Sequence, residues 1–167
     1  AAGAGAGAAA RGRGERAAGQ RLDALDELRD AGAGRQEDRL EEGHLERVAR
    51  LLDRGSGFLE LSRLAGLNMH DDDGKKAVLG GGSIVGIGTV AGKRVLISAS
   101  DSGVKGGTVP PMGLKKALRA QEIARENKLP LVYLVESGGA NLMYQAEIFV
   151  DGGRSFANQA RLSAAGI

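Results

Sequence analysis

Cysteine and tryptophan are both absent from this sequence of 167 residues, and histidine occurs only twice. Without cysteine the chain can form no disulfide, no thiolate metal site and no thiol nucleophile. Aromatic residues make up only 3% of the chain, which argues against a stacking surface for single-stranded nucleic acid. The net charge of +2, from 23 basic and 21 acidic residues, gives no strong field to attract DNA or RNA.

Long apolar runs are missing as well, since no stretch approaches the roughly 18 uncharged apolar residues that a membrane helix needs. The hydrophobic content of 42% and the charged content of 26% are typical of one globular domain of ordinary size. Glycine, in contrast, is abundant at 28 residues, many of them near the amino terminus or between positions 80 and 113.

The amino-terminal third differs in composition from the rest of the chain. Residues 1–20 are mostly alanine, glycine and arginine. They offer too little apolar surface to offset the entropy lost on ordering, so we predict a disordered low-complexity tail. Residues 21–57 predict a helical arm, with one helix over 21–30 and an amphipathic one over 35–53. Because the chain does not begin with methionine, we expect it to be part of a longer protein.

The remaining region, residues 58–167, predicts an α/β domain. Apolar and β-branched residues indicate strands over 58–62, 83–90 and 93–100. The last two strands are separated only by Ala91 and Gly92, which predicts a β-hairpin.

The first of these hairpin strands contains a pattern that imitates a dinucleotide-binding motif. Gly86, Gly88 and Ala91 fit G-x-G-x-x-A. That motif requires a helix after the glycines, whereas a second strand follows here. We therefore interpret the two glycines as positions of close packing or strand curvature.

The second half of the domain predicts a crossover between parallel strands. Residues 113–127 have a helical apolar face, and residues 131–135 form a short apolar run typical of a buried strand. A strand, a helix and a further strand in this order predict a βαβ unit with the strand over 93–100. Residues 151–153 predict a turn, and residues 154–165 a final helix.

Two glycine-rich segments follow the strands that this crossover places side by side. They are residues 105–108, KGGT, and residues 136–140, ESGGA. Ligands of open α/β folds bind at the carboxyl ends of strands. Adjacent glycines allow the backbone to approach a bound group and to direct N–H groups at its oxygen atoms. We therefore predict that these loops hold a thioester or another carbonyl compound, where amides suit a developing oxyanion.

Other polar residues predict no catalytic or metal site. His44 and His70 are most simply surface residues, and no nucleophilic triad can be assembled. The three aspartates at 71–73 lack the spacing of a calcium loop. The KGGT segment lacks the full G-x-x-x-x-G-K-[ST] pattern, so ATP binding is not predicted.

Three segments from Leu51 onward carry a family resemblance. They read LLDRGSGFLELS, GGGSIVGIGTVAGKRVLISASDSGVKGGTVPPMGLKKALRAQEIARENKLPLVYLVESGGANL and FANQARLSAAGI. In their order and spacing they resemble the carboxyltransferase (β) subunit of biotin-dependent acyl-CoA carboxylases, the group of methylcrotonyl-, geranyl- and propionyl-CoA carboxylases. The segment TVPPMGLKKALRAQEIA is more similar to the methylcrotonyl than to the propionyl type.

The resemblance implies an α/β, crotonase-like (ClpP/crotonase) fold of stacked ββα units, here incomplete, with a helical amino-terminal arm. Residues 58–167 would then be a partial CoA carboxyltransferase amino-terminal domain. The implied reaction transfers a carboxyl group from carboxybiotin, carried by a partner α subunit, to the α- or γ-carbon of an acyl-CoA. The family also implies a homo-oligomer of β subunits, a hexamer by analogy. It implies a cytoplasmic location, or the mitochondrial matrix in a eukaryote, with no metal, nucleic acid or membrane as a partner.

The resemblance also assigns the two glycine loops to the walls of the acyl-CoA site. No catalytic residue is assigned, because the family's main oxyanion motif is expected beyond Ile167, and we expect residues 1–167 alone to catalyse no transfer. Glu136 is then interpreted as a structural residue rather than an acid. The implied acyl-CoA-binding residues are Lys105, Gly106, Gly107, Thr108, Ser137, Gly138, Gly139, Ala140 and Asn141.

Two alternatives remain open from the sequence. The first is a crotonase-fold enoyl-CoA hydratase or isomerase, which would need an acidic pair that is not evident here. The second is a non-catalytic assembly piece, whose charged amino-terminal helices would contact a biotin-carrying subunit.

Overall fold

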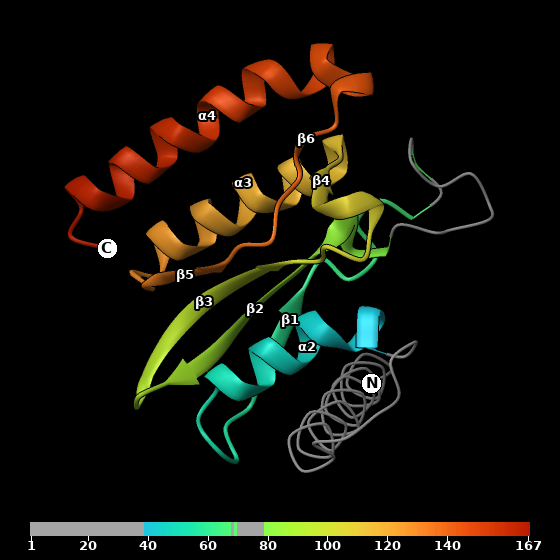
Figure 1. Ribbon diagram of the computed structural model, residues 1–167. Helices are drawn as coiled ribbons and strands as arrows, with labels where there is room; N and C mark the ends of the chain where they lie inside the picture. The colour runs from blue at the N-terminus through green and yellow to red at the C-terminus, as the bar shows by residue number, and fades with distance from the viewer. Residues whose placement is uncertain (1–38, 68, 70–78) are drawn as a thin grey trace, which may run out of the picture.

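A four-stranded sheet forms the centre of the structure, a computed structural model that describes residues 39–67, 69 and 79–167 (Figure 1). The strand order is β1-β2-β3-β5. β1 pairs with β2 and β2 with β3 in antiparallel fashion, whereas β3 and β5 are parallel. The strands are β1 (Leu59–Leu61), β2 (Ser83–Val90), β3 (Lys93–Ser100) and β5 (Leu131–Leu134).

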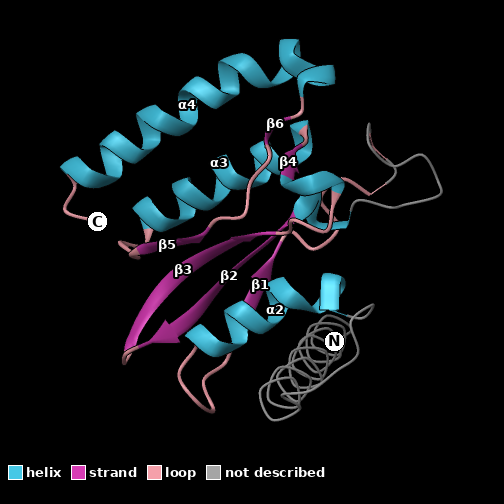
Figure 2. Cartoon of the chain, in the orientation of Figure 1, coloured by secondary structure: helices cyan, strands magenta, loops and turns pink. Residues whose placement is uncertain are grey.

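Helices cover both faces of this sheet (Figure 2). Helix α2 (Arg39–Leu51) lies on one face, and α3 (Pro111–Glu126) with α4 (Gln145–Ala164) lies on the other. Two short strands, β4 (Thr108–Val109) and β6 (Gly139–Ala140), form a separate parallel pair. The described part of the chain also contains the 3₁₀ segments η1 (Leu79–Gly82), η2 (Lys105–Gly107) and η3 (Leu142–Tyr144).

The alternation of side chains along β3 divides the core between these two faces. Ile97, fully buried, packs with Val48 of α2, while the neighbouring Leu96 packs with Ala120 and Ala124 of α3. Successive side chains of a strand point to opposite faces, so one strand serves both cores. The predicted α/β class is confirmed, and β2, β3 and α3 together form one ββα unit.

The predicted β-hairpin is confirmed. Its register runs from Ser83 opposite Ser100 to Val90 opposite Lys93. Ala91 and Gly92 both have positive φ, of 50° and 73°, as a two-residue hairpin turn of the primed type requires. The carboxylate of Asp53 accepts hydrogen bonds from both turn amides, each at 2.8 Å. This side chain therefore fastens the segment after α2 to the hairpin turn.

The interpretation of Gly86 and Gly88 as packing positions is also confirmed. A Cβ atom on Gly86 would lie 2.3 Å from Cζ of Phe58, and one on Gly88 would lie 2.2 Å from Cδ2 of Leu52. Both distances are far below contact, so side chains from the α2 face fill the space above these glycines. No helix opens at this point, which excludes a dinucleotide fingerprint.

The predicted crossover is present as β3–α3–β5, but β5 is less buried than the sequence suggested. Tyr133 is 39% exposed, and the rest of β5 is only partly buried. The strand is the last in the sheet order, so one of its edges has no neighbouring strand in the described part of the chain. An apolar run of four residues cannot distinguish an edge strand from a central one.

The predicted turn at residues 151–153 is wrong, because α4 passes through it without a break from Gln145 to Ala164. A Cβ atom on Gly152 or Gly153 would meet nothing within 4 Å, so no contact forces these glycines out of helical geometry. Arg154 pairs with Asp151 at 3.0 Å across this stretch. Packing against α3 therefore outweighs the roughly 1 kcal/mol that each glycine costs in a helix.

Helix α4 buries only part of its apolar surface. Ile148 and Leu162 are buried against α3 and the sheet, while Phe149 and Phe156 remain 83% and 72% exposed. Over the described residues, no helix is both long and apolar enough to cross a membrane. The predicted tail over 1–20 and helix over 21–30 lie outside the described residues, as does the aspartate run at 71–73.

Candidate functional site

The two predicted glycine loops are in direct contact. The first leads from the end of β3 into β4, and the second from the end of β5 into β6 (Figure 1). β4 and β6 pair in parallel, with Thr108 opposite Gly139 and Val109 opposite Ala140. The amide of Gly138 donates a hydrogen bond to the carbonyl of Gly107 at 3.0 Å. The structure thus brings together the segments 105–108 and 137–141 that the sequence singled out.

Glycine is required at two positions of this contact, one on each loop. A Cβ atom on Gly107 would lie 2.4 Å from the carbonyl oxygen of Glu136, and one on Gly138 would lie 2.5 Å from that of Gly106. Both distances are shorter than any real contact to a Cβ atom, and the obstructing atoms belong to the backbone. The loops can therefore approach this closely only if both residues lack a side chain.

The first loop is a left-handed turn. Lys105, Gly106 and Gly107 have φ angles of 48°, 65° and 73°. Lys105 is the residue in this turn that pays a steric cost, since it carries a Cβ atom. The hydroxyl of Thr108 donates to the carbonyl of Lys105 at 3.0 Å and closes the turn. Gly107 is buried, whereas Lys105 and Gly106 are exposed.

Several amides that the sequence suggested for ligand binding have acceptors inside the chain. Gly107 donates to the carbonyl of Val104 at 2.9 Å, and Gly139 donates to the hydroxyl of Ser137 at 3.0 Å. With the bond from Gly138 to Gly107, three glycine amides are engaged in shaping the loops and joining them. The side chain of Asn141 accepts from the amide of Met143 and so caps η3. These groups therefore fix the backbone of the two loops and of the segment that follows them.

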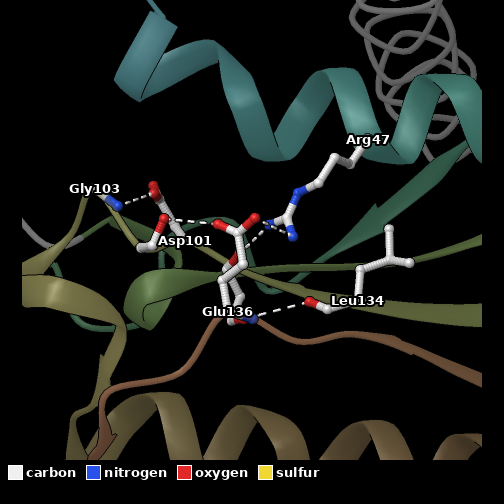
Figure 3. A network of polar contacts seen from close by, with 7 residues as sticks. Arg47, Asp101, Gly103, Leu134 and Glu136 are labelled. Carbon is white, nitrogen blue, oxygen red and sulfur yellow. Dashed lines mark hydrogen bonds and ion pairs between the residues drawn. The ribbon is translucent and has the colours of Figure 1, made fainter.

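A polar network that the sequence did not reveal surrounds Glu136, the first residue of the ESGGA segment and the residue directly before the 137–141 loop (Figure 3). Arg47 of α2 forms an ion pair with the Glu136 carboxylate at 2.9 Å and donates to the carbonyl of Ser100 at 2.7 Å. The hydroxyl of Ser102 donates to the other carboxylate oxygen at 2.6 Å. Nearby, Asp101 accepts from the amide of Gly103 at 2.8 Å. No local sequence pattern could have paired an arginine of the helical arm with this glutamate.

Metal and histidine chemistry receives no support from the described residues. Nowhere in residues 39–67, 69 and 79–167 do three potential metal ligands gather into a cluster. His70 lies outside the described residues, and so does the side chain of His44.

The profile of the carboxyl transferase domain family matches residues 35–167. This match covers most of the chain, including the sheet and both glycine loops, and the chain therefore belongs to the carboxyl transferase domain family.

Two relatives with more than half of the aligned residues identical are carboxylase beta subunits. Over 125 residues the chain is 54% identical to the probable methylcrotonoyl-CoA carboxylase beta chain, mitochondrial, of Drosophila melanogaster, covering 73% of this chain and 21% of that protein. It is equally 54% identical over 125 residues to the biotin-dependent 3-methylcrotonyl-coenzyme A carboxylase beta1 subunit of Mycobacterium tuberculosis, covering 73% and 23%.

A solved structure that resembles this chain is also a carboxylase beta subunit. The beta subunit of geranyl-CoA carboxylase from P. aeruginosa superposes with a TM-score of 0.65 at 53% identity, covering 89% of this chain and 28% of that one. The chain thus spans less than a third of the length of each of these three proteins.

Proposed function

We propose that this chain supplies part of the acyl-CoA site in the carboxyltransferase (β) component of a biotin-dependent acyl-CoA carboxylase. The observation that carries the proposal is the backbone contact between residues 105–108 and 137–141 in a chain of the carboxyl transferase family. The reaction would move a carboxyl group from carboxybiotin to the α- or γ-carbon of an acyl-CoA. We also propose that the β2–β3–α3 unit is one of the stacked ββα units of a crotonase-like fold.

The joined loops have bare backbone positions that suit a bound thioester. Gly106 and Gly139 are exposed, have φ angles of 65° and 91°, and would present a Cβ atom to open space with nothing within 4 Å. Gly107 and Gly138, next to them, face the opposite loop. A ligand could therefore approach the backbone at Gly106 and Gly139 without displacing any part of the chain.

The chain's own contribution would be to hold and orient the acyl-CoA. Carboxybiotin, delivered by a partner subunit, would supply the carboxyl group. Lys105, exposed at the start of the first loop, places a positive charge where phosphate groups of CoA could pair with it. The rigid wall formed by the two loops would fix the thioester, and correct positioning alone can supply a large part of a rate enhancement.

The relatives suggest the substrate class and the partners. They are named for methylcrotonoyl-CoA and geranyl-CoA, so we propose an acyl-CoA of this kind as the substrate. The proposed assembly contains a biotin-carrying α subunit and a homo-oligomer of β subunits, with a hexamer as the prediction. The proposed location is the cytoplasm of a bacterium or the mitochondrial matrix of a eukaryote.

A hydratase or isomerase would require a carboxylate directed at the acyl group. Glu136, the carboxylate adjoining the second loop, is instead paired with Arg47 and accepts from Ser102. The geometry therefore favours carboxyl transfer, which needs no acid at this position.

A segment exchange tests the proposed function in a complete subunit. Residues 35–167 would replace the matching segment of the M. tuberculosis beta1 subunit, assembled with that enzyme's biotin-carrying partner. We expect carboxylation of 3-methylcrotonyl-CoA within about tenfold of the parent rate, a loss of about 1.4 kcal/mol in transition-state binding. A chimera that assembles and unfolds like the parent but neither binds nor carboxylates any acyl-CoA would refute the proposal.

Chemical protection gives a second, local test. Acyl-CoA should shield Lys105 from acetylation in the chimera, as measured by peptide mass spectrometry. Lys93 is a matched control, because it is exposed at the opposite end of β3. Equal labelling of Lys105 with and without acyl-CoA would count against the first loop as a wall of the site.

A further inference from the structure

Glu136 joins three parts of the molecule through its side chain and backbone. Its carboxylate pairs with Arg47 of α2 and accepts from Ser102, beyond the end of β3. Its backbone amide donates to the hydroxyl of Ser100, which in turn donates to the carbonyl of Leu134 at 3.3 Å. Figure 3 shows the Glu136 carboxylate beside the guanidinium group of Arg47, with helix α2 above them.

The same residue also sets the distance between the two glycine loops. The carbonyl oxygen of Glu136 lies against Gly107, where it occupies the space that a Cβ atom would need. Two residues later, Gly138 donates to the carbonyl of Gly107. Rotation of the Glu136 backbone would therefore move the start of the 137–141 loop and break its contact with the 105–108 loop.

The ion pair contributes more to position than to stability. The side chains of Arg47 and Glu136 are 29% and 46% exposed. Ion pairs with this degree of exposure contribute little to stability, because water screens the charges. Arg47, however, holds Glu136 and the carbonyl of Ser100 at the same time, so the strand end and the loop cannot shift independently.

We propose that Glu136 is a positioning residue: anchored by Arg47 of α2, it sets the geometry of the 137–141 wall and thereby the affinity for acyl-CoA. This inference rests on the proposed function of the two loops. It also gives helix α2 a role in substrate binding, although α2 lies on the face of the sheet opposite α3 and α4.

The test compares Glu136→Gln with Glu122→Gln in the active chimera. Glu122 is a matched control, because it pairs with Arg119 at 3.1 Å with side chains 37% and 58% exposed, on helix α3. For Glu136→Gln we expect KM for acyl-CoA to rise about fivefold, the upper end of what a partly exposed ion pair can supply, with kcat changed less than about twofold. Glu122→Gln should change neither constant.

A double-mutant cycle separates positioning from general damage. Arg47→Met should raise KM as much as Glu136→Gln, and the double variant should be no worse than either, since both remove one interaction. In the 167-residue chain, Glu136→Gln should accelerate hydrogen exchange at the Gly138 amide by up to about fivefold relative to Glu122→Gln.

The possible failures are distinguishable. An unsubstituted chimera without acyl-CoA binding would refute the proposed function. An active chimera in which Glu136→Gln leaves KM unchanged would refute the positioning role alone. Additive effects of the Arg47 and Glu136 substitutions, or equal exchange at Gly138 in both glutamine variants, would also overturn it.

Discussion

Replacement of Gly107 by alanine should destabilise the protein through contact between two backbones. The added Cβ atom would lie 2.4 Å from the carbonyl oxygen of Glu136, which cannot rotate away as a side chain could. Alanine at a φ of 73° costs about 1–2 kcal/mol. Separation of the loops would also lose the hydrogen bond from Gly138 to Gly107, worth about 0.5–1.5 kcal/mol. Together these terms predict a loss of about 1.5–3.5 kcal/mol.

Gly106→Ala is the control that isolates the close approach. Gly106 has a similar φ of 65°, but an added Cβ atom would meet nothing within 4 Å. Gly106→Ala should therefore lose only the stability that a positive φ costs an alanine, about 1–2 kcal/mol. Urea unfolding of the two variants, with equal m-values, measures the difference directly.

Ligand binding gives a second comparison of the two alanine variants. Because Gly106 lies on the open side of the loops, Gly106→Ala should weaken acyl-CoA binding in the chimera, although it should destabilise the fold less than Gly107→Ala does. If Gly107→Ala and Gly106→Ala lose the same stability within about 0.5 kcal/mol, the reasoning about backbone contact is wrong.

Three further substitutions test other contacts of the fold. Lys116, 4% exposed, donates to the carbonyls of Gly80 and Ser83 at 3.0 and 2.7 Å. Lys116→Met should therefore lower the free energy of unfolding in urea by about 2–3 kcal/mol. Lys115→Met, at an exposed position, should change it by less than about 0.5 kcal/mol. Gly153→Ala, in the open middle of α4, should raise the free energy of unfolding by up to about 1 kcal/mol, and a loss of stability would show that the helix is not continuous there. Asp53→Ala should lower the free energy of unfolding by about 1–2 kcal/mol, because the amides of Ala91 and Gly92 lose their acceptor. Hydrogen exchange at these two amides should become faster, and unchanged exchange would contradict the role of the Asp53 carboxylate.

The contact between the two loops could be predicted from the sequence because it depends on strand order alone. Parallel strands joined by a crossover helix end at the same edge of a sheet, so loops that follow them become neighbours. The hairpin turn and the interpretation of Gly86 and Gly88 as close-packing positions could likewise be predicted, since both depend on local residue types, whereas the partners Phe58 and Leu52 are known only from the structure.

The features that sequence could not predict depend on tertiary contacts. The pairing of Arg47 with Glu136 joins segments with no pattern in common, and requires α2 to lie across the ends of β3 and β5. The hydrogen bond from the Gly138 amide to the Gly107 carbonyl depends on the register between β4 and β6. The helix through Gly152 and Gly153 follows from packing of α4 against α3, which overrides local propensity.

The contact between the glycine loops also divides the site into positions that can and cannot vary. At Gly107 and Gly138 every possible substitution adds atoms where another backbone already lies, so mutation can only separate the loops. At Lys105 and Ala140, in contrast, an exposed side chain already projects from the backbone, so it can change without bringing the two backbones into conflict. We therefore expect proteins of this family to adapt to different acyl groups by exchanging such side chains while the two touching glycines stay the same. A scaffold of this kind would let substrate preference evolve without disturbing the contact between the two loops.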